Sequence, residues 1–222
     1  MSINLKTFRI EQLNKCIDHC KKLFPIPPNA FQISTLSNIS HQDVIGLTKI
    51  VEALKKHMGI EFKTRVTITD VGPEHGGAWI HVDSYKPISN GKPNYDFVFE
   101  IGIRLKSLLG TREWVIMAIA HELSHLRLYS MDHVLKNSEI MTDIFCIFSG
   151  FGDLYFYLSK DEIKDLSKLG RKFFEGETEA YRKGESNYLT KFEELYVFAK
   201  WKIYCFTDAF EAVKGIFGKS TN

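Results

Sequence analysis

The segment of residues 114–129, WVIMAIAHELSHLRLY, constrains the fold more than any other part of the chain. Its first half is apolar on almost every side, which is typical of a helix buried in a protein core. In the middle of this segment stand His121, Glu122 and His125. Because burying an unpaired carboxylate is very unfavourable, the folded protein has to supply these polar groups with a partner.

Two amphipathic helices are expected before this segment. Residues 8–23 have helical periodicity and stop at the motif PIPP, because proline cannot continue a helix. Residues 40–59 form the second, with Ser40 as the expected N-cap and Gly59 as the expected terminator.

The hydrophobic period then changes to two, which indicates β-strands. Alternation is clear in three segments, residues 62–70, 78–83 and 95–103. From Thr111, the expected N-cap of the central helix, the pattern is helical again almost to the end. The exception is the polar segment 174–188, which we expect to be a mobile loop, with a lid over the cleft as the less favoured reading. The order predicts an α+β fold with a small sheet of three or more strands and a helical C-terminal half.

Composition favours one ordinary globular domain. The chain has 222 residues, of which 44% are hydrophobic and 25% charged, and it contains no repeat and no low-complexity linker. We therefore expect a single domain, 1–222, with N-terminal helices in 1–60, the sheet in 61–104, metal-binding helices in 111–150 and C-terminal helices in 151–222.

Charge and cysteine content limit the partners. The formal net charge is only +2 and no basic block stands out, so neither nucleic acid nor a membrane surface is expected as a partner. The N-terminus lacks the features of a signal peptide, and the segment around SGFG is expected to be a buried helix followed by a turn, not a membrane span. Four irregularly spaced cysteines argue against a disulfide framework. A reducing cytoplasm is the expected location, and the oligomeric state is left open.

The spacing of the two histidines suggests a metal site. Residues four apart share one face of an α-helix, so His121 and His125 can direct both imidazoles at one ion. Glu122 lies beside them without ligating and is placed to take a proton from a metal-bound water. The alternative is a pair of hydrogen-bonded core histidines next to a buried ion pair.

The third ligand decides the class of metal site. A metzincin-type continuation fails, because Leu128 and Met131 occupy the required Gly and His positions and His133 is out of phase. Downstream, Glu139 and Asp143 are four apart on another, otherwise apolar, helix.

This second pair of carboxylates suits a metal and its outer partner. Glu139 would complete a His2Glu zinc site with an open fourth position, and Asp143 would accept a hydrogen bond from a ligand histidine. The competing interpretation is helix capping for Glu139 and a core hydrogen bond for Asp143.

The motifs HELSH and NSEIMTD together resemble the gluzincin zinc metallopeptidases, which carry His-Glu-x-x-His followed by Glu-x-x-x-Asp on the next helix. The resemblance covers residues 95–150. It implies a minimal zincin-like fold, a peptide or protein substrate, and one Zn2+ per chain held by three ligands, His121, His125 and Glu139. It also implies Glu122 as the general base, Asp143 as the partner of His121, and 95–103 as the edge strand that pairs with extended substrate.

Several functional questions stay open at this stage. The family's additional oxyanion donor is not placed, and the candidates are Tyr129, His133, Tyr181 and Tyr188. The substrate-binding residues are unknown. Two other functions are compatible with the same motif: a non-catalytic zinc-containing binding module or pseudo-protease, and a regulatory protease that cleaves one specific protein.

Overall fold

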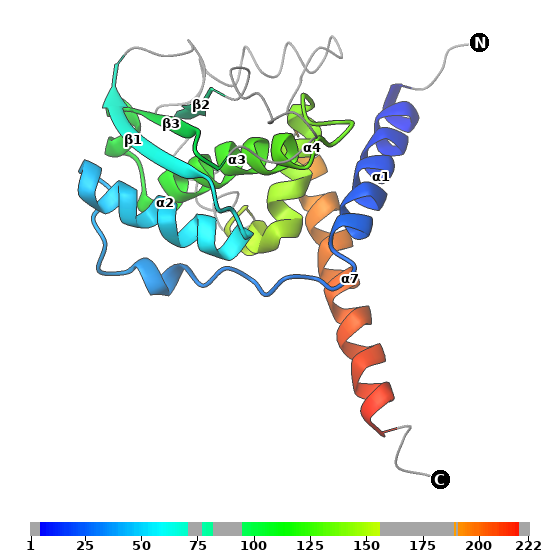
Figure 1. Cartoon of the computed structure of the whole chain (residues 1–222). Coiled ribbons are helices and arrows are strands. Elements are labelled where there is room, and N and C mark those ends of the chain that lie inside the picture. The colour runs from blue at the N-terminus through cyan, green and yellow to red at the C-terminus, as the bar shows by residue number, and fades with distance from the viewer. Residues whose placement is uncertain (1–4, 71–76, 82–94, 156–188, 190, 218–222) are drawn as a thin grey trace. The chain divides into compact units, whose positions relative to one another are not determined.

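The computed structural model describes residues 5–70, 77–81, 95–155, 189 and 191–217. Within these ranges the fold is α+β, with five α-helices and a three-stranded mixed sheet (Figure 1). Backbone contacts divide the chain into two compact units. We call Phe31–Ser138 the central unit, and Met1–Ala30 together with Glu139–Asn222 the terminal unit. The single domain expected from composition stays a prediction.

The sheet belongs to the central unit and has the order β1-β3-β2. Strand β1 (Lys63–Thr69) runs parallel to β3 (Val98–Arg104), and β2 (Ala78–Ile80) runs antiparallel to it. The expectation that 95–103 forms an edge strand is therefore wrong. β3 pairs with β1 on one side and with β2 on the other, so its backbone groups are used within the sheet. Although β3 comes just before α3 in the sequence, it is the central strand of the sheet.

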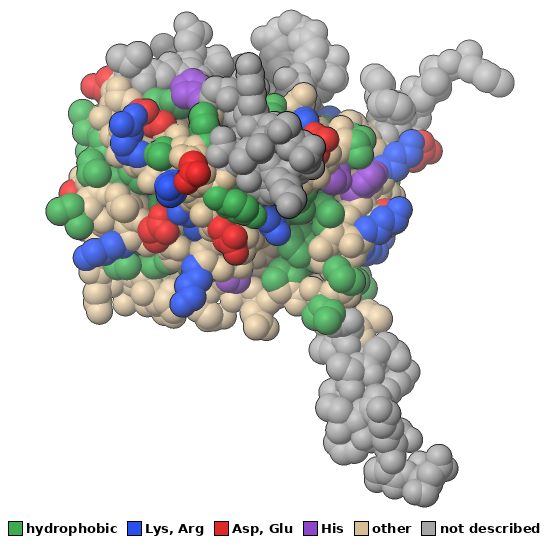
Figure 2. Space-filling model, in the orientation of Figure 1, with side chains coloured by type: hydrophobic (Ala, Val, Ile, Leu, Met, Phe, Trp, Pro, Cys, Tyr) green, Lys and Arg blue, Asp and Glu red, His purple; other side chains and the backbone are tan. Residues whose placement is uncertain are grey.

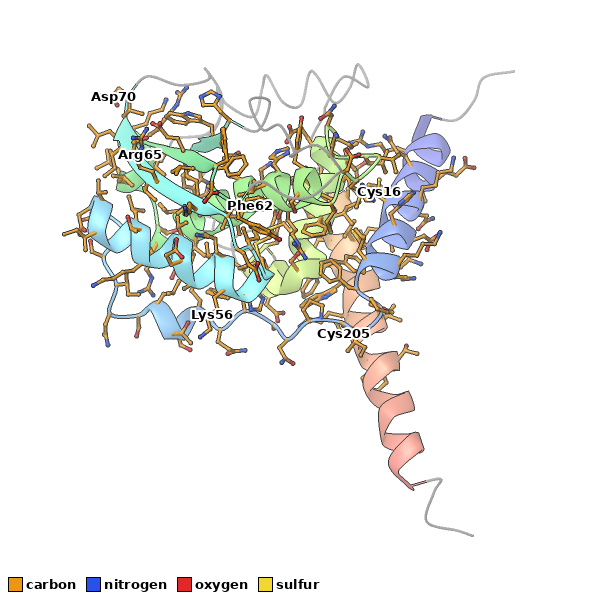
Figure 3. All side chains as sticks on the ribbon, viewed as in Figure 1. Cys16, Lys56, Phe62, Arg65, Asp70 and Cys205 are labelled. Carbon is orange, nitrogen blue, oxygen red and sulfur yellow. The ribbon has the colours of Figure 1, made fainter. Side chains whose placement is uncertain are left out.

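Two helices of the central unit cover one face of this sheet (Figure 1). They are α2 (Val44–Met58), which packs on β1, and α3 (Arg112–Ser130), which packs on β2. Phe62 lies buried beneath the sheet, where its ring meets that of Phe99 at a centroid distance of 5.3 Å (Figure 3). The alternating apolar residues of the strands thus build the core on which α3 rests.

The ends of α2 and α3 follow from local capping. Asp43, and not Ser40, is the N-cap of α2, since its side chain accepts from the Gly46 N–H at 2.8 Å. Ser40 stands earlier, where its hydroxyl accepts from the N–H of Gln42. The expected terminator Gly59 is confirmed with φ 63° and ψ 40°, and Thr111 caps α3 by accepting from Trp114 N–H at 3.3 Å.

The opposite face of the sheet carries paired charges. Arg65 contacts Glu100 at 2.7 Å and Lys63 contacts Asp96 at 3.1 Å. Hydrogen bonding from Arg65, joined by Thr67, lowers the pKa of Glu100. Figure 2 shows acidic and basic side chains interspersed on the viewed face, which agrees with the small net charge of the sequence.

The terminal unit is helical in the part that the structure describes. It contains α1 (Leu5–Leu23), α4 (Glu139–Cys146), the π-helical segment η3 (Ile147–Phe151) and α7 (Lys191–Phe217). Side chains join α1 to α7, with Arg9 to Glu193 at 2.8 Å and Tyr196 OH donating to Asn14 at 2.8 Å.

At SGFG, where a buried helix followed by a turn is expected, two helices meet across a kink. Gly150 adopts φ 100° inside η3, a conformation that favours glycine, and the chain then stays helical through Tyr155. At Gly152 an added Cβ would lie 2.6 Å from the indole of Trp201, so the missing side chain lets α7 pack closely.

Some expectations fall outside the described residues. These are the proposed loop or lid at 174–188 and the candidate oxyanion donors Tyr181 and Tyr188. Among the helices that are described, none combines the length and apolarity needed to cross a membrane.

Gly59 provides a test of the C-terminal end of α2. Replacing it with alanine should lower the free energy of unfolding by about 1 kcal/mol, because a side chain disfavours the left-handed backbone. In a chain of this size that corresponds to a melting temperature about 2–4 °C lower. The matched control Gly59→Asn should lose less, since asparagine tolerates this conformation. Equal losses in a thermal unfolding series would contradict the assignment, because no neighbour lies within 4 Å of an added Cβ.

Candidate metal centre

Helix α3 presents two imidazoles side by side. His121 and His125 are separated by one helical turn, and their ring centroids lie 4.9 Å apart with an interplanar angle of 79°. Both side chains are half-buried, whereas Ile119, Leu123 and Leu126 on other sides of the helix are fully buried. The apolar residues therefore hold the helix in the core while the imidazoles reach its more open face.

Glu122 is held by the backbone of the sheet. The N–H of Ile80 in β2 donates to Oε2 of Glu122 at 3.1 Å. The backbone N–H of Arg104 donates to Gly77, which fixes the alternation of this antiparallel pair, so the Ile80 N–H points away from β3. A side chain from α3 thus takes one donor on the side of β2 that faces away from β3, and this fixes the orientation of the Glu122 carboxylate.

Glu139, the first residue of α4, completes a group with the two histidines. The ligand atoms of His121, His125 and Glu139 all lie within 4.8 Å of one another, and all three residues are half-buried. Two imidazole nitrogens and a carboxylate oxygen form a donor set that suits a divalent metal ion. The structure therefore bears out the predicted convergence of these three residues as a group that can hold a metal.

The separations are compatible with an ion of the size of zinc. Because a Zn–N or Zn–O bond is about 2.1 Å in a tetrahedral site, its donors lie about 3.4 Å apart. Small rotations about side-chain bonds cover the remaining difference of up to about 1.4 Å. The three residues present fit the group that the sequence predicts.

Asp143 is buried one turn further along α4. Its Oδ1 accepts from the Tyr155 hydroxyl at 3.1 Å and its Oδ2 accepts from the Leu189 N–H at 3.2 Å. Burial raises the pKa of Tyr155 well above its usual value, and the nearby Cys146 and Asp143 raise it further, so the hydroxyl keeps its proton and acts as the donor. The proposed hydrogen bond from His121 to Asp143 stays a prediction.

Tyr129 and His133, two of the candidate oxyanion donors, both take part in the connection between α3 and α4. The Tyr129 hydroxyl donates to Oδ1 of Asn137 at 2.6 Å. His133 is buried, and its Nδ1 accepts from the N–H of Leu135 at 3.1 Å. Each side chain therefore has a structural partner close to the metal ligands in sequence.

The cysteines do not form a second metal centre in the described part of the chain. All four are free thiols, and burial raises the pKa of both Cys16 and Cys20, which keeps them protonated. Cys16 lies on α1 and Cys205 on α7 (Figure 3). Among the described residues, the group that could hold a metal ion is His121, His125 and Glu139.

Two contacts at this site could not be inferred from the sequence. The donor to Glu122 is a backbone N–H, and any residue other than proline at position 80 would provide it. Tyr155 lies about three turns after Asp143 and has no motif around it, although a buried tyrosine hydroxyl in an apolar segment does require a partner.

Comparisons with protein-family models, with curated proteins and with solved structures found no match.

The candidate metal centre predicts how much zinc each chain binds and which substitution removes it. Purified wild-type protein should contain one zinc per chain. Glu139→Ala should weaken zinc binding by more than about a hundredfold, the upper range for losing an outer partner of a ligand. Elemental analysis with chelator competition measures both.

Glu52→Ala is a matched control, because Glu52 is an exposed helical glutamate that pairs with Lys55. It should bind zinc like wild type. Equal zinc content in wild type and Glu139→Ala would exclude Glu139 as a ligand.

Proposed function

We propose that this protein is a zinc-dependent metallopeptidase of the gluzincin type, which hydrolyses peptide bonds in a peptide or protein substrate. The proposal is carried by one observation, the approach of the ligand atoms of His121, His125 and Glu139 to within 4.8 Å of one another. Under this proposal the α+β fold is a minimal zincin-like arrangement, in which the sheet rests on the metal-binding helix.

Zinc is the metal that this donor set favours. Two histidines and one glutamate are a recurrent catalytic zinc set, in which three protein ligands leave the fourth position open. When bound, zinc supplies a Lewis acid for the scissile carbonyl and lowers the pKa of a water molecule towards about 7.

Glu122 acts as the general base in this proposal. It takes the proton from the attacking water and returns it to the leaving amine. The Ile80 N–H at 3.1 Å supports the role, because it restricts the carboxylate to one orientation without using it as a metal ligand. A base positioned in advance avoids part of the ordering that a free side chain would require in the transition state.

The substrate is proposed to lie along β2. The sequence predicts that residues 95–103 pair with the substrate, but this segment forms β3, which is the central strand. On β2, the backbone groups of Ala78 and Ile80 point away from β3, and Glu122 already meets this side of the strand. Because Glu122 takes the Ile80 N–H, an extended peptide on this side of β2 would pair through the backbone groups of Ala78 and the Ile80 carbonyl, with its scissile bond near the general base.

In this proposal Asp143 is the hydrogen-bond partner of the ligand His121. A carboxylate that accepts a hydrogen bond from the second nitrogen of His121 fixes the tautomer that binds metal. The contacts from Tyr155 and Leu189 support this role, since they hold both oxygens of Asp143 in place. We further propose narrow substrate specificity and a cytoplasmic location, both from the sequence alone.

The decisive experiment uses Glu122→Gln, which keeps the size of the side chain and its acceptor for Ile80. The variant should bind zinc as wild type does and lose peptide hydrolysis by about 10²–10⁴-fold, the range expected for removal of general acid–base catalysis. Zinc is measured by elemental analysis, and turnover by cleavage of a quenched fluorescent peptide library and of unfolded proteins.

A zinc-containing binding module makes the opposite prediction. If the biological activity survives in Glu122→Gln but is lost in His121→Ala, the metal serves structure or partner binding and the peptidase proposal is wrong. The two variants therefore separate catalysis from metal-dependent binding.

A further inference from the structure

The connection between α3 and Glu139 is organised by its own hydrogen bonds. The backbone N–H of His133 donates to the Leu128 carbonyl at 3.0 Å, which ties the connection to the last turn of α3. The His133 carbonyl accepts from Lys136 N–H at 3.0 Å, and its Nδ1 accepts from Leu135 N–H at 3.1 Å. His133 is buried and thus serves as the centre of this short loop.

A side-chain hydrogen bond fastens the far end of the loop to the same helix. Tyr129 follows His125 by four residues, so both lie on one face of α3. The Tyr129 hydroxyl donates to Oδ1 of Asn137 at 2.6 Å. The face that carries the two imidazoles therefore also carries the attachment point for the returning chain.

The ring of Tyr129 is itself supported. The ammonium of Lys136 lies 5.3 Å from the ring centroid, and the same lysine pairs with Asp132 four residues earlier. Asp132 has φ 48°, in the left-handed region that aspartate adopts more readily than most residues. The loop thus adopts one defined turn at its start and one fixed contact at its end.

Asn137 is close enough to Glu139 for this contact to matter. The two residues are separated by Ser138 alone, and two residues span at most about 7 Å of chain. Fixing Asn137 against Tyr129 therefore restricts the Glu139 backbone to a small volume along the imidazole face. A ligand restricted before the ion arrives loses less conformational entropy on binding, which strengthens the affinity.

We propose that Tyr129 is a positioning residue that holds Glu139 in place for metal binding by donating to Asn137. The inference rests on the proposed metal site and assigns Tyr129 no contact with substrate. In this inference Tyr129 affects the affinity for the metal. From the sequence it was a candidate for donating a hydrogen bond to the oxyanion, which is a different role.

The test compares two tyrosine hydroxyls with the same partner chemistry. Tyr129→Phe removes the hydroxyl and keeps the ring under Lys136. Tyr196→Phe is the matched control, because Tyr196 also donates to an asparagine, Asn14, at 2.8 Å, between α7 and α1. Zinc affinity is measured by competition with a chromophoric chelator, alongside the melting temperature of the metal-free proteins.

Tyr129→Phe should weaken zinc binding about three- to tenfold, which corresponds to the loss of one hydrogen bond. The control should bind zinc like wild type. Asn137→Ala should weaken binding by the same factor as Tyr129→Phe, and the double variant should be no weaker than either, since both changes remove one contact.

Unchanged zinc affinity in Tyr129→Phe, or an equal change in Tyr196→Phe, overturns the inference while the metal site stands. Additive losses in the double variant also overturn it, because they would mean that the tyrosine acts by another route. If wild type binds no zinc with an affinity that depends on Glu139, the proposed function fails and this inference fails with it.

Discussion

The structure depends on how two imidazoles and a carboxylate are accommodated on a helix that packs its other sides into the core. The buried residues of α3 support the sheet, so His121, Glu122 and His125 stay half-buried and do not turn fully to water. Each polar group must be matched where it stands. The sheet supplies a backbone donor for Glu122, and Glu139 supplies a carboxylate that approaches both imidazoles.

Backbone and side chains divide the task of holding this centre. Glu122 is held by an N–H of β2, and that donor persists through substitution of the Ile80 side chain. Asp143 is held by one side-chain and one backbone donor, from Tyr155 and Leu189. The connection that leads to Glu139 is fixed mainly by backbone hydrogen bonds around His133, with the Tyr129 hydroxyl at its end. A ligand set arranged in this way is ordered before any ion binds, which favours affinity and a single coordination geometry.

Local sequence signals predicted a large part of the fold because they act over a few residues. The prolines after Leu23, the left-handed Gly59 and the Thr111 cap all mark helix ends where they were expected. The strand segments also appear, although shorter than the alternation suggested. One failure is itself local: Asp43 and not Ser40 caps α2, because the Asp43 side chain is the one that accepts from the N–H three residues later. The other failure involves neighbours distant in sequence. The expected edge strand became the centre of the sheet because β1 and β2 pair on both of its sides.

For the candidate site, the sequence by itself determined which residues share a helical face. The fixed pitch of the α-helix makes His121 and His125 neighbours, and it does the same for Glu139 and Asp143, whatever else the chain does. Only the tertiary structure decided that a glutamate from beyond the connection approaches the histidine pair, and that a backbone N–H of β2 meets Glu122. The reason is physical: helical spacing depends on covalent geometry and local hydrogen bonds, whereas an approach between separate elements depends on the packing of the whole core.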